Sequence, residues 1–80
     1  MKKRNVIGKN LKVLRENEGI SQQQLASKLH LLGLNMDRSA ISRIESFTRE
    51  VYDYEVIYFA AALNISVVNL YREINIEKKV

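Results

Sequence analysis

The sequence predicts an all-α protein, a bundle of five short helices, on three observations. Apolar residues recur at i, i+4 and i+7 in several stretches, which is the spacing of one helix face. Capping residues and glycines separate these stretches, and the 80-residue chain contains no proline. No stretch alternates apolar and polar residues strongly enough to favour a sheet. The length corresponds to a single domain.

The first helix is expected at residues 6–18. Asn5 is a suitable N-cap, and Gly19 fits the left-handed residue that ends many helices. Ile20 would supply the apolar contact that accompanies this ending. The expected buried face consists of Ile7, Leu11 and Leu14.

The second and third helices are expected at residues 22–32 and 38–46. The stretch S-Q-Q-Q from Ser21 to Gln24 has the pattern of a capping box, and Gly33 follows the second helix. Asp37 is the predicted cap of the third helix. The expected apolar stripe of the second helix is Leu25, Leu29 and Leu32.

The rest of the chain contains two further predicted helices. After a loop over residues 46–53, Tyr52 or Asp53 caps a helix whose apolar stripe is Val56, Phe59, Ala60 and Leu63. Ser66 is expected to cap a short last helix with Val67, Leu70 and Tyr71. Residues 1–72 therefore form the predicted domain. Residues 73–80 form a C-terminal tail that fits a strand, an extended arm or a frayed helix equally well.

Composition excludes several classes of protein. The chain has no cysteine, so neither disulfides nor thiolate chemistry is available. The longest uncharged apolar run, residues 56–63, is too short to cross a membrane, and residues 1–12 do not resemble a signal peptide. We therefore expect a soluble, cytoplasmic protein.

The charges are unevenly distributed along the chain. Net charge is +4, and residues 1–15 carry six Lys or Arg and no acid, whereas residues 51–80 carry three against four acids. A basic end suits an anionic partner such as nucleic acid or an acidic membrane surface. The alternative is a solvated face that only keeps the chain soluble.

Sets of residues that carry out catalysis are missing from the sequence. The stretch IGKN lacks the frame of a phosphate-binding loop. His30 is the only histidine, and no cysteine or carboxylate stands at metal-ligand spacing from it. No serine has a histidine and a carboxylate suitably placed. We therefore expect no enzyme activity, no cofactor and no metal.

The predicted helix at residues 38–46 has two chemically different faces. At about 100° per residue, Ala40, Ile41 and Ile44 share one side. A guanidinium can bond the O6 and N7 of a guanine together, and a serine can reach a phosphate or a base edge. The opposite side carries such groups, namely Arg38, Ser39, Ser42 and Arg43.

Three motifs occur in order: S-Q-x-x-L-A-x-K-L, then I-S-R-I-E, then A-x-A-L-x-I-S. Through them, residues 7–71 resemble the Cro and lambda-repressor-like, XRE-type helix-turn-helix family. The resemblance implies a five-helix lambda-repressor-like bundle that binds double-stranded DNA. In this arrangement the second helix of the motif, here residues 38–46, enters the major groove.

The resemblance also implies roles for particular residues. Base-reading positions would be Arg38, Ser39, Ser42 and Arg43. Phosphate contacts would come from Gln22, Ser46, Thr48 and Arg49. The basic N-terminal end, with Lys9, is either a further phosphate contact or a solvated tail. Arg15 and Glu45 match a partly buried ion pair with a structural role.

Two features depart from the family pattern. The stretch HLLGLNMD adds about five residues between the motifs, so the second helix or the turn is longer. Its Leu31, Leu32 and Leu34 should be buried against the third helix or another protomer. Phe47 stands where the family commonly has glycine, and a left-handed residue there is strained. Either the helix ends differently or Phe47 serves as an apolar contact.

Two functions remain after this reading. The first is a sequence-specific, repressor-like transcriptional regulator that binds DNA as a homodimer. The alternative is a protein-interaction module, such as an antitoxin, whose partner covers exposed apolar residues; binding to a membrane surface is a distant third. Residues that fit either a dimer face or the core are Tyr52, Tyr54, Tyr58, Tyr71, Ile74 and Ile76.

Overall fold

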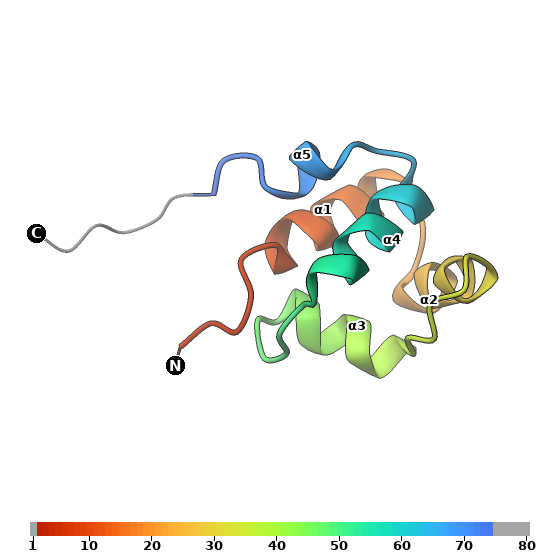
Figure 1. Cartoon of the computed structure of the whole chain (residues 1–80), viewed down its shortest axis with the longest axis horizontal. Coiled ribbons are helices and arrows are strands. Elements are labelled where there is room, and N and C mark those ends of the chain that lie inside the picture. Colours follow the sequence, from red (N-terminus) through yellow and green to blue (C-terminus); the bar gives the residue numbers. More distant parts are fainter. Residues whose placement is uncertain (1, 75–80) are drawn as a thin grey trace, which may run out of the picture.

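The computed structural model describes residues 2–74 and contains five helices and no strand within them, as predicted (Figure 1). The helices are α1 Gly8–Asn17, α2 Gln22–Leu31, α3 Arg38–Glu45, α4 Asp53–Leu63 and α5 Val67–Leu70. None of the helices within residues 2–74 is long and apolar enough to cross a membrane. The expected ends of α2 and α3 are right to within one residue.

Local sequence signals account for the helix ends around the motif. Gly19 has φ +71°, and the amides of Gly19 and Ile20 bond back to the carbonyls of Glu16 and Arg15, which closes α1 as predicted. The Ser21 hydroxyl accepts from the Gln24 amide at 3.0 Å, and the Gln24 side chain accepts from the Ser21 amide at 2.8 Å. This reciprocal pair is the predicted capping box.

Helix α1 begins two residues later than predicted, at Gly8, and its N-cap position is Ile7. Asn5 still accepts a hydrogen bond from the Gly8 amide at 2.8 Å. Its side-chain nitrogen, however, donates to the carbonyls of Ile44 and Arg49. Asn5 is therefore held by residues far along the chain, which sets where the helix can start.

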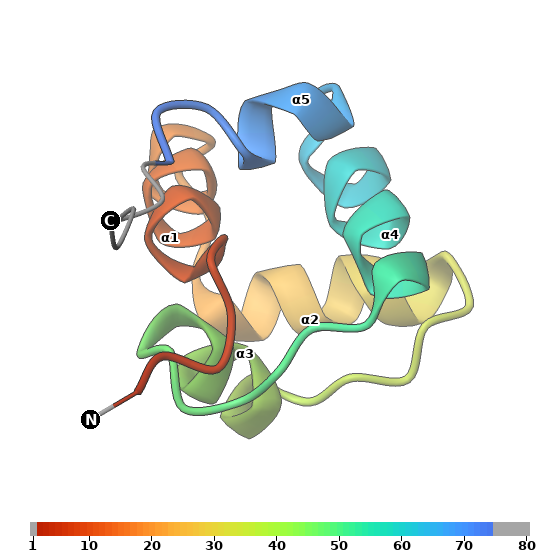
Figure 2. The ribbon, with the colours of Figure 1, turned by 60° about the vertical axis from the view of Figure 1, so that its left-hand side comes forward.

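The core lies where all five helices meet. Helices α2 and α3 lie on one side of α1 and α4, and α5 crosses between α1 and α4 on the opposite side (Figure 2). Helix α3 packs against both α1 and α2. The largest fully buried side chains are Phe59, Ile7, Leu11, Leu25, Leu29, Ile41, Ile44, Leu63 and Leu70. They include two residues of each stripe predicted for α1, α2 and α4, and the other two residues of the α4 stripe, Val56 and Ala60, are also buried.

The inserted leucines behave differently from the prediction. Leu34 is buried in the core, but Leu31 is 85% exposed and Leu32 is 46% exposed. The reason is that α2 ends at Leu31 and the chain turns at Gly33, so that Leu34 reaches the core instead. The expectation that all three are buried is wrong for the single chain.

Helix α5 also differs in detail. Leu70 is its only buried residue, whereas Val67 and Tyr71 are exposed, because a helix of four residues presents a single position inward. Ser66 occupies the predicted N-cap position, but its side chain makes no capping hydrogen bond. Ile74 packs at the edge of the core, and Ile76 lies outside the described residues.

Phe47 ends α3 in the left-handed conformation, with φ 66°. Its amide bonds to the carbonyl of Ile44, and the Thr48 amide bonds to that of Arg43, the pattern usual around a glycine. The helix thus ends in the family manner with a residue that has a β-carbon. Such a conformation costs roughly 1–2 kcal/mol relative to a right-handed one.

Candidate nucleic-acid interface

The outer face of α3 is open to solvent. Arg38, Ser39, Ser42 and Arg43 are all exposed, and Arg43 donates to the Ser39 hydroxyl at 3.2 Å. On the other side of the helix, Ile41 and Ile44 are fully buried and Ala40 nearly so. The two faces deduced from the sequence are therefore the two faces of the folded helix.

Asp37 fixes the start of α3. Its carboxylate accepts from the Ala40 amide at 2.8 Å, as an N-cap does. The predicted cap is thus confirmed, and the Asp37 carboxylate is the partner of the Ala40 amide. The amides of Arg38 and Ser39 precede the first intrahelical hydrogen bonds.

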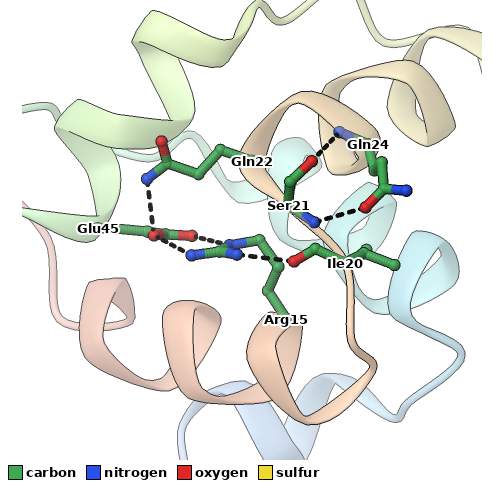
Figure 3. A network of polar contacts seen from close by, with 6 residues as sticks. All are labelled: Arg15, Ile20, Ser21, Gln22, Gln24 and Glu45. Carbon is green, nitrogen blue, oxygen red and sulfur yellow. Dashed lines mark hydrogen bonds and ion pairs between the residues drawn. The ribbon is translucent and has the colours of Figure 1, made fainter.

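Arg15 and Glu45 form a bidentate ion pair behind α3. Arg15 Nε lies 2.8 Å from one carboxylate oxygen of Glu45, and the Arg15 amino group lies 3.0 Å from the other. Both side chains are less than 10% exposed. Arg15 also donates to the Ile20 carbonyl at 2.7 Å, so the pair joins α1, the following turn and α3 (Figure 3).

Gln22 completes this network. Its side-chain nitrogen donates to Glu45 at 3.0 Å, so that Gln22 and Arg15 reach the same carboxylate (Figure 3). The pKa of Arg15 is raised, mainly by its hydrogen bonds to Glu45 and further by the negative charge of that carboxylate. Burial lowers the pKa and so opposes part of the rise. The network fixes α2 relative to α3, which is the relation that a helix-turn-helix requires.

The loop after α3 contains two exposed hydroxyls. The Ser46 and Thr48 oxygens lie 3.1 Å apart, and each lies 3.2 Å from the Arg43 carbonyl. Arg49, by contrast, forms two 3.1 Å hydrogen bonds with Glu55 and donates to the Glu50 carbonyl. Its guanidinium ties the loop to α4, and bonding to Glu55 raises its pKa.

Lys9 is exposed on α1. It lines a surface pocket of about 220 Å³ together with Lys3, Phe47 and Glu73, so a carboxylate shares its surroundings. The structure therefore groups Lys9 with the N-terminal segment and the end of α3, and not with the outer face of that helix.

Two residues, Asn5 and Gly8, position the interface through long-range contacts that the sequence did not predict. Asn5 binds the backbone at the end of α3 and in the following loop, at 3.0 and 2.8 Å. Gly8 packs so closely on α3 that a β-carbon there would collide with the Ile44 carbonyl oxygen. The partners lie about 40 residues away in the sequence. Only the glycine at the third position of the predicted helix 6–18 hinted at a close approach.

The candidate dimer residues divide between surface and core. Tyr52 and Tyr54 are about half exposed and stack with ring centroids 5.9 Å apart. Tyr71 is also exposed, whereas Tyr58 and Ile74 are partly buried against the core. His30 is exposed, and no group of three possible metal ligands occurs within residues 2–74.

A short helix that is anchored by isoleucines, braced on the preceding helix and polar on its free face defines a helix-turn-helix DNA-binding domain. Residues 11–70 match the family model described as Helix-turn-helix, of the XRE type, and the chain belongs to this family. It is thus a DNA-binding transcriptional regulator, a class that is non-enzymatic in general.

A solved structure agrees with this assignment. The chain is similar to the restriction-modification controller protein C.AhdI from Aeromonas hydrophila, known from a high-resolution crystal structure. The two are 31% identical with a TM-score of 0.71, and the match covers 80% of this chain and 86% of that chain. Among curated proteins, no match was found.

Proposed function

We propose that this regulator reads a specific DNA sequence by inserting α3 into the major groove. The observation that carries the proposal is the free face of α3, on which Arg38, Ser39, Ser42 and Arg43 are exposed while the opposite face is anchored in the core. Arg38 and Arg43 bond guanine edges, and the two serines contact base edges or phosphate without blocking approach.

Phosphate contacts hold the helix in register. Ser46 and Thr48 present hydroxyls at the end of α3, and Gln22 reaches the same region from the first turn of α2. Arg49 contributes through the quarter of its side chain that stays exposed beside Glu55, and Lys9 through its charge on α1. These contacts position the protein and carry no sequence information by themselves.

The regulator acts as a homodimer on a two-fold symmetric site and represses transcription by occupying it. Dimeric helix-turn-helix proteins bind half-sites about one helical turn, roughly 34 Å, apart. The similarity to a restriction-modification controller protein supports a role in controlling the expression of other genes. Stacked and exposed Tyr52 and Tyr54 are suitable residues for the dimer face.

One observation favours a second function, binding of a protein partner such as a toxin. Leu31 and Leu32 are exposed beside Ala61 and Ala62 of α4, around a surface pocket of about 220 Å³. Salt separates the two functions, because DNA binding through several phosphates weakens steeply with salt, whereas binding to an apolar surface does not.

The test is selection of bound duplexes from a random pool at physiological salt. An inverted repeat, bound by two chains, is the expected result. Arg38→Ala should weaken binding by about 1–3 kcal/mol and relax the preference at one base position. Lys28→Ala is the control, because Lys28 is an exposed cation of α2 beside α4. An equal loss on all sequences would refute base reading by Arg38, and a single asymmetric site would refute the symmetric dimer.

A further inference from the structure

The segment between α2 and α3 is the place where this chain is longer than the family pattern. It begins at Leu32, the C-cap of α2, and ends at Asp37, the N-cap of α3. Figure 2 shows that much of this segment lies at the level of α3, on the lower side of the view. We call residues 32–37 the long turn. It adds exposed chain to the side of the molecule that carries the recognition helix.

The backbone of the long turn is fixed at both ends. Gly33 has φ +100°, and its amide bonds to the His30 carbonyl at 3.0 Å. The Leu34 amide bonds to the Leu29 carbonyl at 2.9 Å. At the other end, Asp37 caps α3. A segment that is already fixed in this way loses little conformational freedom when it binds a ligand.

Burial alternates along the long turn. Leu34 and Met36 are 9% and 6% exposed and belong to the core, whereas Asn35 and Asp37 are exposed. This is the alternation of an extended chain, in which successive side chains point to opposite sides. The core thus anchors the chain immediately before and after Asn35. The Asn35 carboxamide is therefore held outward, on the same side of the chain as Asp37.

Asn35 and Arg38 border the same space. Together with Asp37, both line a surface pocket of about 420 Å³ between α2 and the start of α3. An extended chain rises about 3.3 Å per residue, so the step from Asn35 to Arg38 spans at most about 10 Å. Successive base pairs lie about 3.4 Å apart along a duplex. When Arg38 is on a base, Asn35 therefore lies within about three base pairs of it.

The chemistry at this point favours a base edge over a phosphate. Asp37 also lines the pocket, and its carboxylate repels a phosphodiester. The Arg38 guanidinium is committed to a guanine edge in the proposed function. The Asn35 carboxamide is uncharged and offers a donor and an acceptor together. Adenine presents the matching pair in the major groove, its N7 and its N6 amino group, and asparagine can bond both.

We propose that Asn35 is a further base-reading residue, which binds an adenine in the major groove within about three base pairs of the guanine bound by Arg38. The inference rests on the proposed function, because it uses the same duplex. It gives the long turn a part in specificity and makes Leu34 and Met36 positioning residues. Each half-site is then longer than the stretch that α3 reads alone.

The experiment compares the duplexes that the full chain and its Asn35→Ala variant select from a random pool. The wild-type chain should select an adenine within about three base pairs of the position that Arg38→Ala relaxes. Asn35→Ala should lose this preference and bind the wild-type site about 5- to 150-fold more weakly per half-site, the effect of one bidentate contact. On a duplex in which another base pair replaces that adenine, the two proteins should bind equally.

Two further variants separate base reading from a structural effect. Asn17 is an exposed asparagine at the end of α1, so Asn17→Ala should keep the wild-type motif and an affinity within about twofold. Asn35→Arg should change the preference from adenine to guanine, because arginine bonds guanine O6 and N7 together. A residue that only shapes the turn would not produce this change of base.

Three results would overturn the inference. They are an unchanged motif in Asn35→Ala, an equal loss of affinity on all duplexes, which indicates a phosphate contact, and a lowered urea midpoint that accounts for the loss. The proposed function itself fails if the wild-type chain selects no motif or if Arg38→Ala relaxes no position. If Arg38→Ala relaxes its position and Asn35→Ala relaxes none, only the role of Asn35 is refuted.

Discussion

Removing the buried carboxylate of Glu45 should strongly destabilise the fold. Glu45 accepts two hydrogen bonds from Arg15 and one from Gln22, at 2.8, 3.0 and 3.0 Å, and its side chain is only 4% exposed. Glu45→Ala leaves the Arg15 guanidinium buried with only the Ile20 carbonyl as a partner. Breaking one side of a buried pair typically costs about 3–5 kcal/mol.

That loss is large for a domain of this size. The total free energy of unfolding of a small domain is roughly 5–15 kcal/mol, and short chains fall at the low end of this range. The free energy of unfolding of a small protein falls by about 1 kcal/mol for each molar of urea. A loss of about 3–5 kcal/mol therefore lowers the urea concentration at the unfolding midpoint by about 3 M or more. Urea titration followed by far-UV circular dichroism measures this shift.

Two further variants compare the buried Arg15–Glu45 pair with an exposed ion pair and with an uncharged replacement. Glu50→Ala removes the partner of Arg4 from an exposed pair and should change stability by less than about 1 kcal/mol. Arg15→Met combined with Glu45→Leu removes both charges and should recover most of the loss. A Glu45→Ala variant within about 1 kcal/mol of the wild type, or a double variant no more stable than the single one, would show that the buried charge on Arg15 does not depend on Glu45.

The contribution of Arg15 should not vary with pH in the range where the protein is studied. Its raised pKa means that the stabilisation is complete below the unfolded-state pKa and is lost only as pH rises through the higher folded-state value. Both lie far above neutrality, because arginine stays protonated in proteins. The Arg15 contribution should therefore be the same at about pH 6 and about pH 9 in urea titrations.

Three more substitutions test other parts of the fold by the same urea titration. Gly8→Ala should destabilise by about 1–3 kcal/mol, because its methyl group would collide with the Ile44 carbonyl; an unchanged midpoint would contradict that packing. Ser21→Ala should cost about 0.5–2 kcal/mol through the lost capping bond to the Gln24 amide, and Ser21→Thr should restore most of it. Leu31→Ser should change the stability of the single chain by less than about 0.5 kcal/mol because that side chain is largely exposed, and a larger loss would show that Leu31 is covered in solution.

Much of the interface could be predicted because its signals are local. The capping box at Ser21, the cap at Asp37 and the two faces of α3 each depend on residues within one or two helical turns. The side-chain spacing that places Ile41 and Ile44 together necessarily places Arg38 and Ser42 on the other side. These positions are therefore encoded in short stretches of sequence.

Packing decided the rest. No local pattern indicates whether Leu32 or Leu34 enters the core, since both are apolar and lie on either side of a turning glycine. Arg49 fits a phosphate contact in the sequence, but the fold brings Glu55 to within 3.1 Å of it. The charge of Arg49 does not show, in the sequence, that Glu55 competes with a phosphate for its guanidinium.

The sequence by itself determined the five helices, the N-caps of α2 and α3 and the polar face of α3, because each follows from hydrogen bonds and side-chain spacing over a few residues. Only the tertiary structure decided that Asn5 joins the start of α1 to the end of α3 and that the Lys3 ammonium lies over the Phe47 ring. Those contacts connect residues about 40 positions apart, and they exist only once the core has brought the two ends of the motif together.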